Sequence, residues 1–118
     1  MKVASKKIKF ENALSLECGS TLPSFELMFE TYGELNKENS NAILVCHAFS
    51  GNHHAAGESN IDSSIGWWDQ MIGPNKAIDT NKYFVVCSNN IGGCGGSSGP
   101  TSINPSNGAL YGADFPVV

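Results

Sequence analysis

The run AILVC at residues 42–46, followed directly by HAFSG at residues 47–51, decides how the rest of this sequence is interpreted. An uninterrupted apolar run between turn-forming residues is typical of a strand buried on both faces of a parallel sheet. A second such run, YFVVCS at residues 83–88, predicts a parallel partner reached through a compact crossover. Because open α/β sheets bind ligands at the carboxyl ends of their strands, residues 47–51 are the first candidate site.

The segments before and between these runs complete the expected α/β fold class. Alternation of apolar and polar residues predicts half-exposed, antiparallel strands at residues 8–10, 14–16 and 25–32. Residues 65–72 fit either a short helix or a tightly packed loop. Residues 89–116 are rich in Gly, Ser, Asn and Pro, which predicts a loop, and a loop of that length is uncommon without a function.

Composition narrows the classes of function. The 118 residues include seven lysines, no arginine and eleven acidic residues, for a net charge of −4. Such a chain is a poor candidate for nucleic-acid binding. No apolar run is long enough to span a membrane, and the lysine-rich start has no signal-peptide pattern, so we expect a soluble, cytoplasmic protein.

The cysteines and histidines do not form a metal-binding pattern. The four cysteines are widely spaced, and we expect Cys46 and Cys87, which lie in apolar runs, to be buried as small hydrophobic residues. His53 and His54 are adjacent, so their side chains are expected to diverge and to be either solvated or placed behind the residues that line a site, and no metal is predicted. His47 ends the buried strand, where a hydrogen-bonded structural imidazole is expected.

Two overlapping windows in the glycine-rich loop match the pattern of a nucleophile elbow. GGSSG at residues 95–99 centres on Ser97, and GGCGG at residues 92–96 centres on Cys94. An elbow requires a helix directly after the nucleophile, and Pro100 and the turn residues beyond it prevent one. The favoured interpretation is a loop that folds tightly over a site. Trp67 and Trp68 are likewise interpreted as packing residues rather than as a ligand platform.

The loop at residues 47–51 has two interpretations from its position alone. A small-residue loop after a strand is where α/β-hydrolase folds place one backbone N–H of the oxyanion hole, and such a donor is worth about 2.7–4 kcal/mol in other enzymes. The second interpretation is an ordinary strand-to-helix turn, which would also be rich in small residues.

The chain resembles the homoserine O-acetyltransferase family from about Phe25 onward. The resemblance is carried by CHAFSG at 46–51, AAG at 55–57, GWWDQMIGP at 66–74, DTNKYFVVCSN at 79–89, GSSGPTSINP at 96–105 and YGADFP at 111–116. The Gly-Trp-Trp and Gly-Ser-Ser-Gly-Pro segments together are specific.

The resemblance implies an α/β-hydrolase fold and an enzyme that transfers an acetyl group from acetyl-CoA to the hydroxyl of L-homoserine in methionine biosynthesis. It implies a ping-pong route through an acyl-serine with a Ser-Asp-His triad, no bound cofactor and commonly a homodimer. By this likeness Phe49 supplies an oxyanion-hole N–H, and Ala48, Phe49, Ser50 and Gly51 shape the acyl and acceptor site. The family usually has Leu-Thr where this chain has Phe49-Ser50, which leaves succinyl-CoA and serine open as donor and acceptor.

The triad and the substrate-binding arginine of the family have no counterpart in residues 1–118. Residues 1–118 are therefore expected to be the N-terminal part of one α/β-hydrolase domain, truncated before the nucleophile elbow and inactive alone. The alternatives are an esterase on the same fold, which releases the acyl group to water, and a non-catalytic product, either truncated or an independent binding module.

Overall fold

The computed structural model describes residues 1–118 as short strands joined by turns, with a single 3-10 turn. The strands are β1 (Lys2–Val3), β2 (Lys6–Phe10), β3 (Leu14–Ser15), β4 (Thr21–Leu22), β5 (Phe25–Tyr32), β6 (Ala42–Val45), β7 (Glu58–Ser59), β8 (Ile72–Gly73), β9 (Ile78–Asp79) and β10 (Phe84–Ser88), and the 3-10 turn η1 spans Gly112–Asp114. The chain divides into two compact units, residues 1–6 with 29–88 and residues 7–28 with 89–118. The chain contains no helix of the length and apolarity needed to cross a bilayer.

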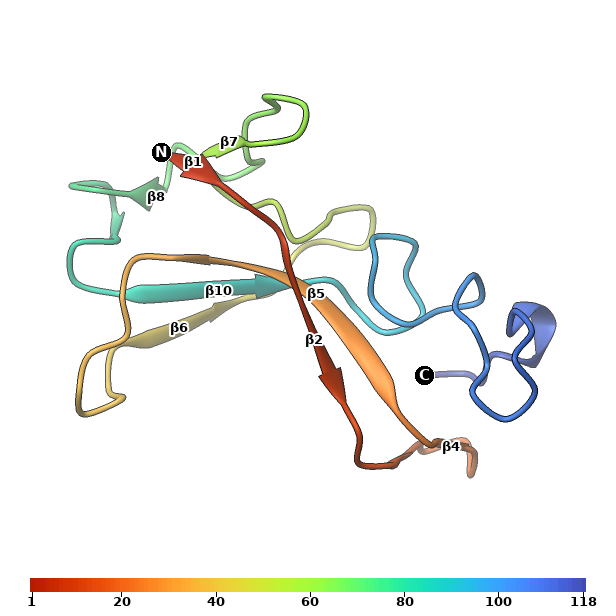
Figure 1. Cartoon of the computed structure of the whole chain (residues 1–118). Helices are drawn as coiled ribbons and strands as arrows, with labels where there is room; N and C mark the ends of the chain where they lie inside the picture. The colour runs from red at the N-terminus through yellow and green to blue at the C-terminus, as the bar shows by residue number, and fades with distance from the viewer. The chain divides into compact units, whose positions relative to one another are not determined.

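The first unit contains the two apolar runs as paired strands. β10 lies between β5 and β6 (Figure 1), parallel to β6 and antiparallel to β5. In the register of the parallel pair, Val85 lies opposite Ile43 and Cys87 opposite Val45. The predicted parallel pairing of the two apolar runs is therefore confirmed, and the carboxyl ends of both strands meet at one edge.

The core of this unit lies on one face of the sheet. Its buried side chains come from the strands and from the crossover between β6 and β10, and they are Val3, Tyr32, Val45, Ala55, Ala56, Ile72, Val85 and Cys87. Burial of a valine or isoleucine side chain contributes about 1.5–3 kcal/mol to the free energy of folding. The small residues Ala55 and Ala56, both fully buried, allow the crossover backbone to approach the strands closely.

The prediction that residues 42–46 are buried on both faces is wrong for this structure. β6 is an edge strand, and Leu44 is 67% exposed whereas Val45 is buried. Successive side chains of a strand point to opposite faces, and only one face of β6 packs on the core. The prediction for the cysteines holds for Cys87, which is buried, and fails for Cys46, which follows the last residue of β6 and is exposed.

The crossover between the parallel strands contains turns rather than a helix. Residues 65–72 form a loop and not a helix, and the backbone of this loop runs along residues 54–57. The expected tight packing holds for Ile72, which is fully buried, and not for Ile65, Trp67, Trp68 and Met71, which are exposed. Gly66 N–H donates to Gly57 O (2.9 Å), and Trp68 N–H donates to Ala55 O (2.7 Å). The two-residue strands of this unit pair as β1 with β7 and β8 with β9, both parallel.

The second unit joins the first half of β5 to the glycine-rich loop. β2 neighbours β5 in the sheet, and β3 and β4 form a short antiparallel pair. Residues 89–118 contain only η1 and an isolated bridge between Ile103 and Leu110, which confirms the predicted long loop. Side-chain hydroxyls attach the loop to β5, since the Oγ atoms of Ser97 and Ser98 accept from the N–H groups of Met28 (2.9 Å) and Glu26 (2.7 Å).

Gly66 tests the close packing of the crossover. A Cβ atom at this position would overlap the backbone of Ala55 and Ala56. We expect Gly66→Ala to lower the free energy of unfolding of the complete gene product by about 1–3 kcal/mol, the usual cost of overpacking. Urea titration measures this change.

Gly93→Ala is the matched control, because the nearest atom to its added Cβ is Asn90 O at 3.2 Å. Equal stability of the two variants would contradict the close approach of the two backbone segments.

Candidate functional site

The loop at residues 47–51 starts where β6 ends, at the edge where the parallel strands have their carboxyl ends. Gly51 N–H donates to Ala48 O (2.8 Å) and closes a tight turn. Phe49, within this turn, is fully exposed, and its N–H donates to none of the backbone carbonyls of the chain. His47 is hydrogen-bonded as expected, with Nδ1 lying 2.8 Å from Ala48 O.

The segment that follows the loop is attached to the core through its backbone. The Tyr32 hydroxyl oxygen, on β5, accepts from the N–H groups of Ala55 (2.8 Å) and Ala56 (3.1 Å). Trp67 Nε1–H donates to Asn52 O (2.9 Å). Residues 52–56 therefore connect the exposed loop to a buried strand through specific hydrogen bonds.

The buried carboxylate of Glu30 lies at the centre of the hydrogen bonds around Tyr32. Glu30 is only 2% exposed, and its Oε2 accepts from the Tyr32 hydroxyl (2.7 Å) while its Oε1 accepts from Ser5 Oγ (3.1 Å). His54 Nδ1 lies 2.9 Å from Oε2, and His53 Nε2 lies 3.9 Å from Oε1. A buried carboxylate is tolerated when such donors compensate for its lost hydration.

The expectation that the side chains of His53 and His54 diverge is wrong, and neither ring is solvated. Their side chains are only 14% and 13% exposed, and both approach the carboxylate of Glu30. Adjacent residues in a loop are not bound to the alternation of a strand, so the backbone turn at this point brings both rings to one side. The sequence signal that was missed is the pair Glu30 and Tyr32, which share one face of β5 at a spacing of two residues.

Burial and hydrogen bonding in this cluster raise the pKa of Tyr32 and of His54. Burial, followed by the hydrogen bond to Glu30, raises the pKa of Tyr32, so the phenol keeps the proton that it donates. Burial acts to lower the pKa of His54, but the hydrogen bonds to Glu30 and to the Ser64 carbonyl outweigh it and raise the pKa. The contact with Glu30 therefore favours the protonated form of the His54 ring.

Ser5 and His53 have the separation of a nucleophile and its base but not the orientation. Ser5 Oγ lies 2.7 Å from His53 Nε2. In a catalytic triad the carboxylate binds the ring nitrogen that does not face the serine. Here Glu30 lies on the Nε2 side as well and also accepts from Ser5 Oγ, so the cluster is a structural network rather than a triad.

The prediction that the glycine-rich loop forms no nucleophile elbow is confirmed. Ser97 is buried, its hydroxyl donates to Asn89 O (2.9 Å), and no helix follows it. Cys94 is exposed within a series of turns.

The prediction that the two tryptophans are packing residues is only partly correct. Trp67 and Trp68 stack on each other with ring centroids 5.7 Å apart and remain 45% and 39% exposed.

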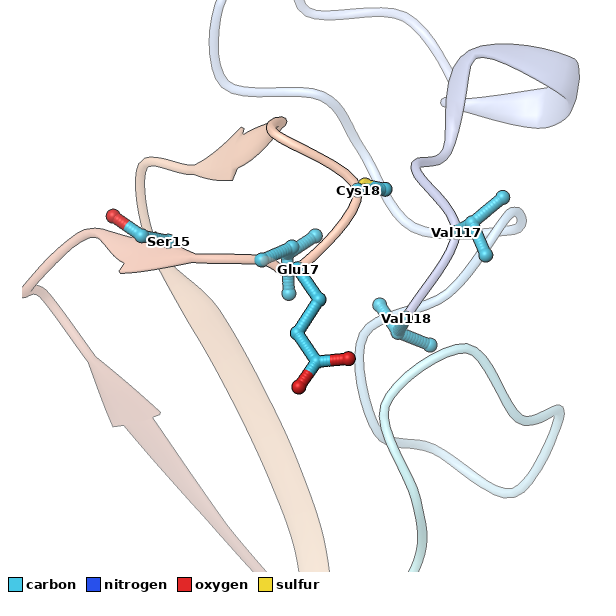
Figure 2. Close-up of a pocket in the computed structure, with 6 residues that line it drawn as sticks. Ser15, Glu17, Cys18, Val117 and Val118 are labelled. Carbon is cyan, nitrogen blue, oxygen red and sulfur yellow. The ribbon is translucent and has the colours of Figure 1, made fainter.

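A hollow of about 520 Å³ in the second unit lies between residues 15–18 and the last two residues, Val117 and Val118 (Figure 2). A hydrogen bond from the backbone of Ser20 lowers the pKa of the exposed Cys18 thiol at its rim. Ser15 and Glu17 also line the hollow, but neither is hydrogen-bonded to the Cys18 thiol, so the hollow has no nucleophile paired with a base as acyl transfer requires.

Tyr32 tests the attachment of residues 52–56. Tyr32→Phe keeps the ring but leaves the buried N–H of Ala56 without an acceptor, at a cost of about 1–3 kcal/mol, whereas the N–H of Ala55 keeps its contact with His53 O (2.9 Å). We expect a lower free energy of unfolding for the complete gene product and faster hydrogen exchange at the Ala56 amide.

The matched control is Tyr83→Phe, which removes the hydroxyl of an exposed tyrosine. If the two variants lose equal stability and exchange at equal rates, the Tyr32 hydroxyl does not hold the segment.

Comparison with known proteins gives close relatives over nearly the whole chain. A homoserine O-succinyltransferase of Psychrobacter arcticus is 62% identical over 119 residues, which cover 98% of this chain and 27% of the relative. The crystal structure of a homoserine O-acetyltransferase from Bacillus anthracis superposes with a TM-score of 0.86 at 44% identity, covering 99% of this chain and 33% of that one. Esterase E22 superposes with a TM-score of 0.82 at 40% identity, covering 97% and 33%. No protein-family model matches the chain.

The chain thus spans about a third or less of the length of these proteins. The structural neighbours have the α/β-hydrolase fold, and the sheet described above forms part of it. The expected fold class is confirmed.

Proposed function

Because this chain belongs to the homoserine O-acyltransferase family over nearly its whole length, we propose that the protein carrying it transfers an acyl group from an acyl-CoA to the hydroxyl of L-homoserine. The observation that supports this most directly is 62% identity to a homoserine O-succinyltransferase across 98% of the chain. The products are an O-acylhomoserine and free CoA, and the reaction belongs to methionine biosynthesis.

Two acyl donors, acetyl-CoA and succinyl-CoA, are compatible with the proposed reaction. The sequence resemblance suggests acetyl-CoA, and a relative of known structure at 44% identity is named an acetyltransferase. The more similar relatives, at 62% and 63% identity, are named succinyltransferases. We favour succinyl-CoA on this ground and keep acetyl-CoA as the competing donor.

In this proposal the chain supplies one oxyanion donor and residues that border the substrates. In the proposal, Phe49 N–H donates to the oxyanion that forms when the nucleophile attacks the thioester carbonyl, and Ala48, Ser50 and Gly51 border the acyl and acceptor groups. The exposed turn after β6 and the lack of a backbone acceptor for Phe49 N–H support this role. None of the serines and cysteines described above is paired with a base in the orientation of a catalytic triad, so we place the nucleophile and its base outside residues 1–118.

Hydrolysis is the second candidate function. Esterase E22 has the same fold at 40% identity, and water in place of homoserine would release the free acid from the same acyl-enzyme. The two functions differ in the acceptor and not in the oxyanion stabilisation.

An assay of CoA release distinguishes them. With the complete gene product, we expect steady-state CoA release from succinyl-CoA or acetyl-CoA to depend on L-homoserine, because each acyl-enzyme must pass its acyl group to the acceptor hydroxyl before a second thioester can react. The ratio of kcat/KM for the two thioesters identifies the donor. Equal acyl loss with and without homoserine would establish a hydrolase instead, and L-serine is the control for acceptor specificity.

Ser97 provides a test of the nucleophile's location. We expect Ser97→Ala to destabilise the complete gene product by about 1 kcal/mol through the lost hydrogen bonds to Met28 and Asn89, and to leave the acyl-enzyme intact. Intact-protein mass spectrometry after mixing with the acyl-CoA measures the covalent adduct. Loss of the adduct in this variant would show that Ser97 is the nucleophile and that the structural interpretation of the loop is wrong.

A further inference from the structure

The carbonyl group of Ala48 accepts two hydrogen bonds within the turn at residues 47–51. Gly51 N–H donates to it from one side (2.8 Å), and His47 Nδ1 lies 2.8 Å from the same oxygen. A carbonyl oxygen can only accept, so His47 Nδ1 carries the proton in this contact. The neutral ring is then the Nδ1–H tautomer, with a lone pair on Nε2.

The orientation of the Ala48 carbonyl determines the direction of the next N–H group. The chain contains no cis peptide bond, and in a planar trans peptide the C=O of Ala48 and the N–H of Phe49 point in opposite directions. Two donors that hold the carbonyl inside the turn therefore hold Phe49 N–H outside it. Rotation of this one peptide would turn the N–H inward and present the carbonyl oxygen to the oxyanion.

The turn is packed tightly around the His47 ring. A Cβ atom at Gly51 would lie 3.0 Å from His47 Cβ and 3.3 Å from Nδ1, so a larger residue would displace the ring. His47 Nε2 is buried and has no hydrogen-bond partner. The contact through Nδ1 is thus the polar interaction that the imidazole makes here, and it is made with the peptide that carries the proposed oxyanion donor.

We propose that His47 is a positioning residue that holds the Ala48–Phe49 peptide in the orientation required for oxyanion stabilisation, through an Nδ1–H to carbonyl hydrogen bond. This role rests on the proposed function of Phe49 N–H. It makes no use of His47 as an acid or base, and no proton is transferred to or from the ring during the reaction.

Two matched substitutions separate the contact from the bulk of the ring. In His47→Asn the side-chain amide N–H reaches the position of Nδ1, whereas in His47→Gln it reaches the position of Nε2. Since loss of a whole oxyanion donor costs about 10²–10³ in kcat, we expect His47→Gln and His47→Ala to lose up to about 100-fold in the acylation rate. His47→Asn should recover most of that loss. KM for the acyl-CoA should change little, because the interaction is made in the transition state.

The tautomer of His47 gives a readout that does not depend on a folded variant. Nitrogen-15 NMR of histidine-labelled wild-type protein at pH 8 should show the neutral Nδ1–H form for His47. The Nε2–H form would overturn the proposal, as would equal activity of the Asn and Gln variants.

The outcomes also distinguish this proposal from the function on which it rests. Acylation without transfer to homoserine would overturn the proposed function alone, because a hydrolase needs the same oxyanion donor. Homoserine-dependent turnover with an Nε2–H tautomer would overturn the positioning role alone.

Discussion

The hydrogen bond from the Tyr32 hydroxyl to the Glu30 carboxylate determines how the first unit of this chain is assembled. Because the phenol proton is directed to Glu30, the lone pairs of the same oxygen remain available for two consecutive backbone N–H groups, those of Ala55 and Ala56. One buried side chain thereby connects β5 to the crossover. The crossover in turn carries the contacts of Gly66 and Trp68, which fold residues 65–68 back on residues 54–57.

This arrangement depends on a charge that would otherwise be expensive to bury. The Glu30 carboxylate faces Tyr32, Ser5 and His54 within hydrogen-bond distance, and a carboxylate with several donors loses less on leaving water than an isolated one. Removing one partner would leave the others around an incompletely satisfied charge, so these residues act as a group. An apolar core of this modest size gains its defined geometry from such directional contacts.

The parts of the structure that could be predicted from sequence are those determined by local patterns. The apolar runs at β6 and β10 predicted both strands and their parallel pairing, and Pro100 excluded a helix after Ser97. The exposure of Leu44 could not be predicted in this way, because burial depends on which elements cover the sheet and not on the strand's own residues.

The cluster around Glu30 was missed for a related reason. His54 and Glu30 are 24 positions apart, and no pattern within a short window links them. The direction of the Phe49 N–H is likewise a property of a turn geometry that the letters HAFSG allow without requiring.

The stacked indoles have a consequence for how this region can be observed. The chain contains two tryptophans, and their rings lie 5.7 Å apart and 15° from parallel. Two chromophores at this separation couple their electronic transitions, so their circular dichroism in the near ultraviolet depends on their mutual angle. Trp67 Nε1–H also donates to the carbonyl oxygen of Asn52, the residue directly after the turn at residues 47–51. The pair is therefore a built-in optical reporter, and a ligand that shifts the turn would change its spectrum without any added label.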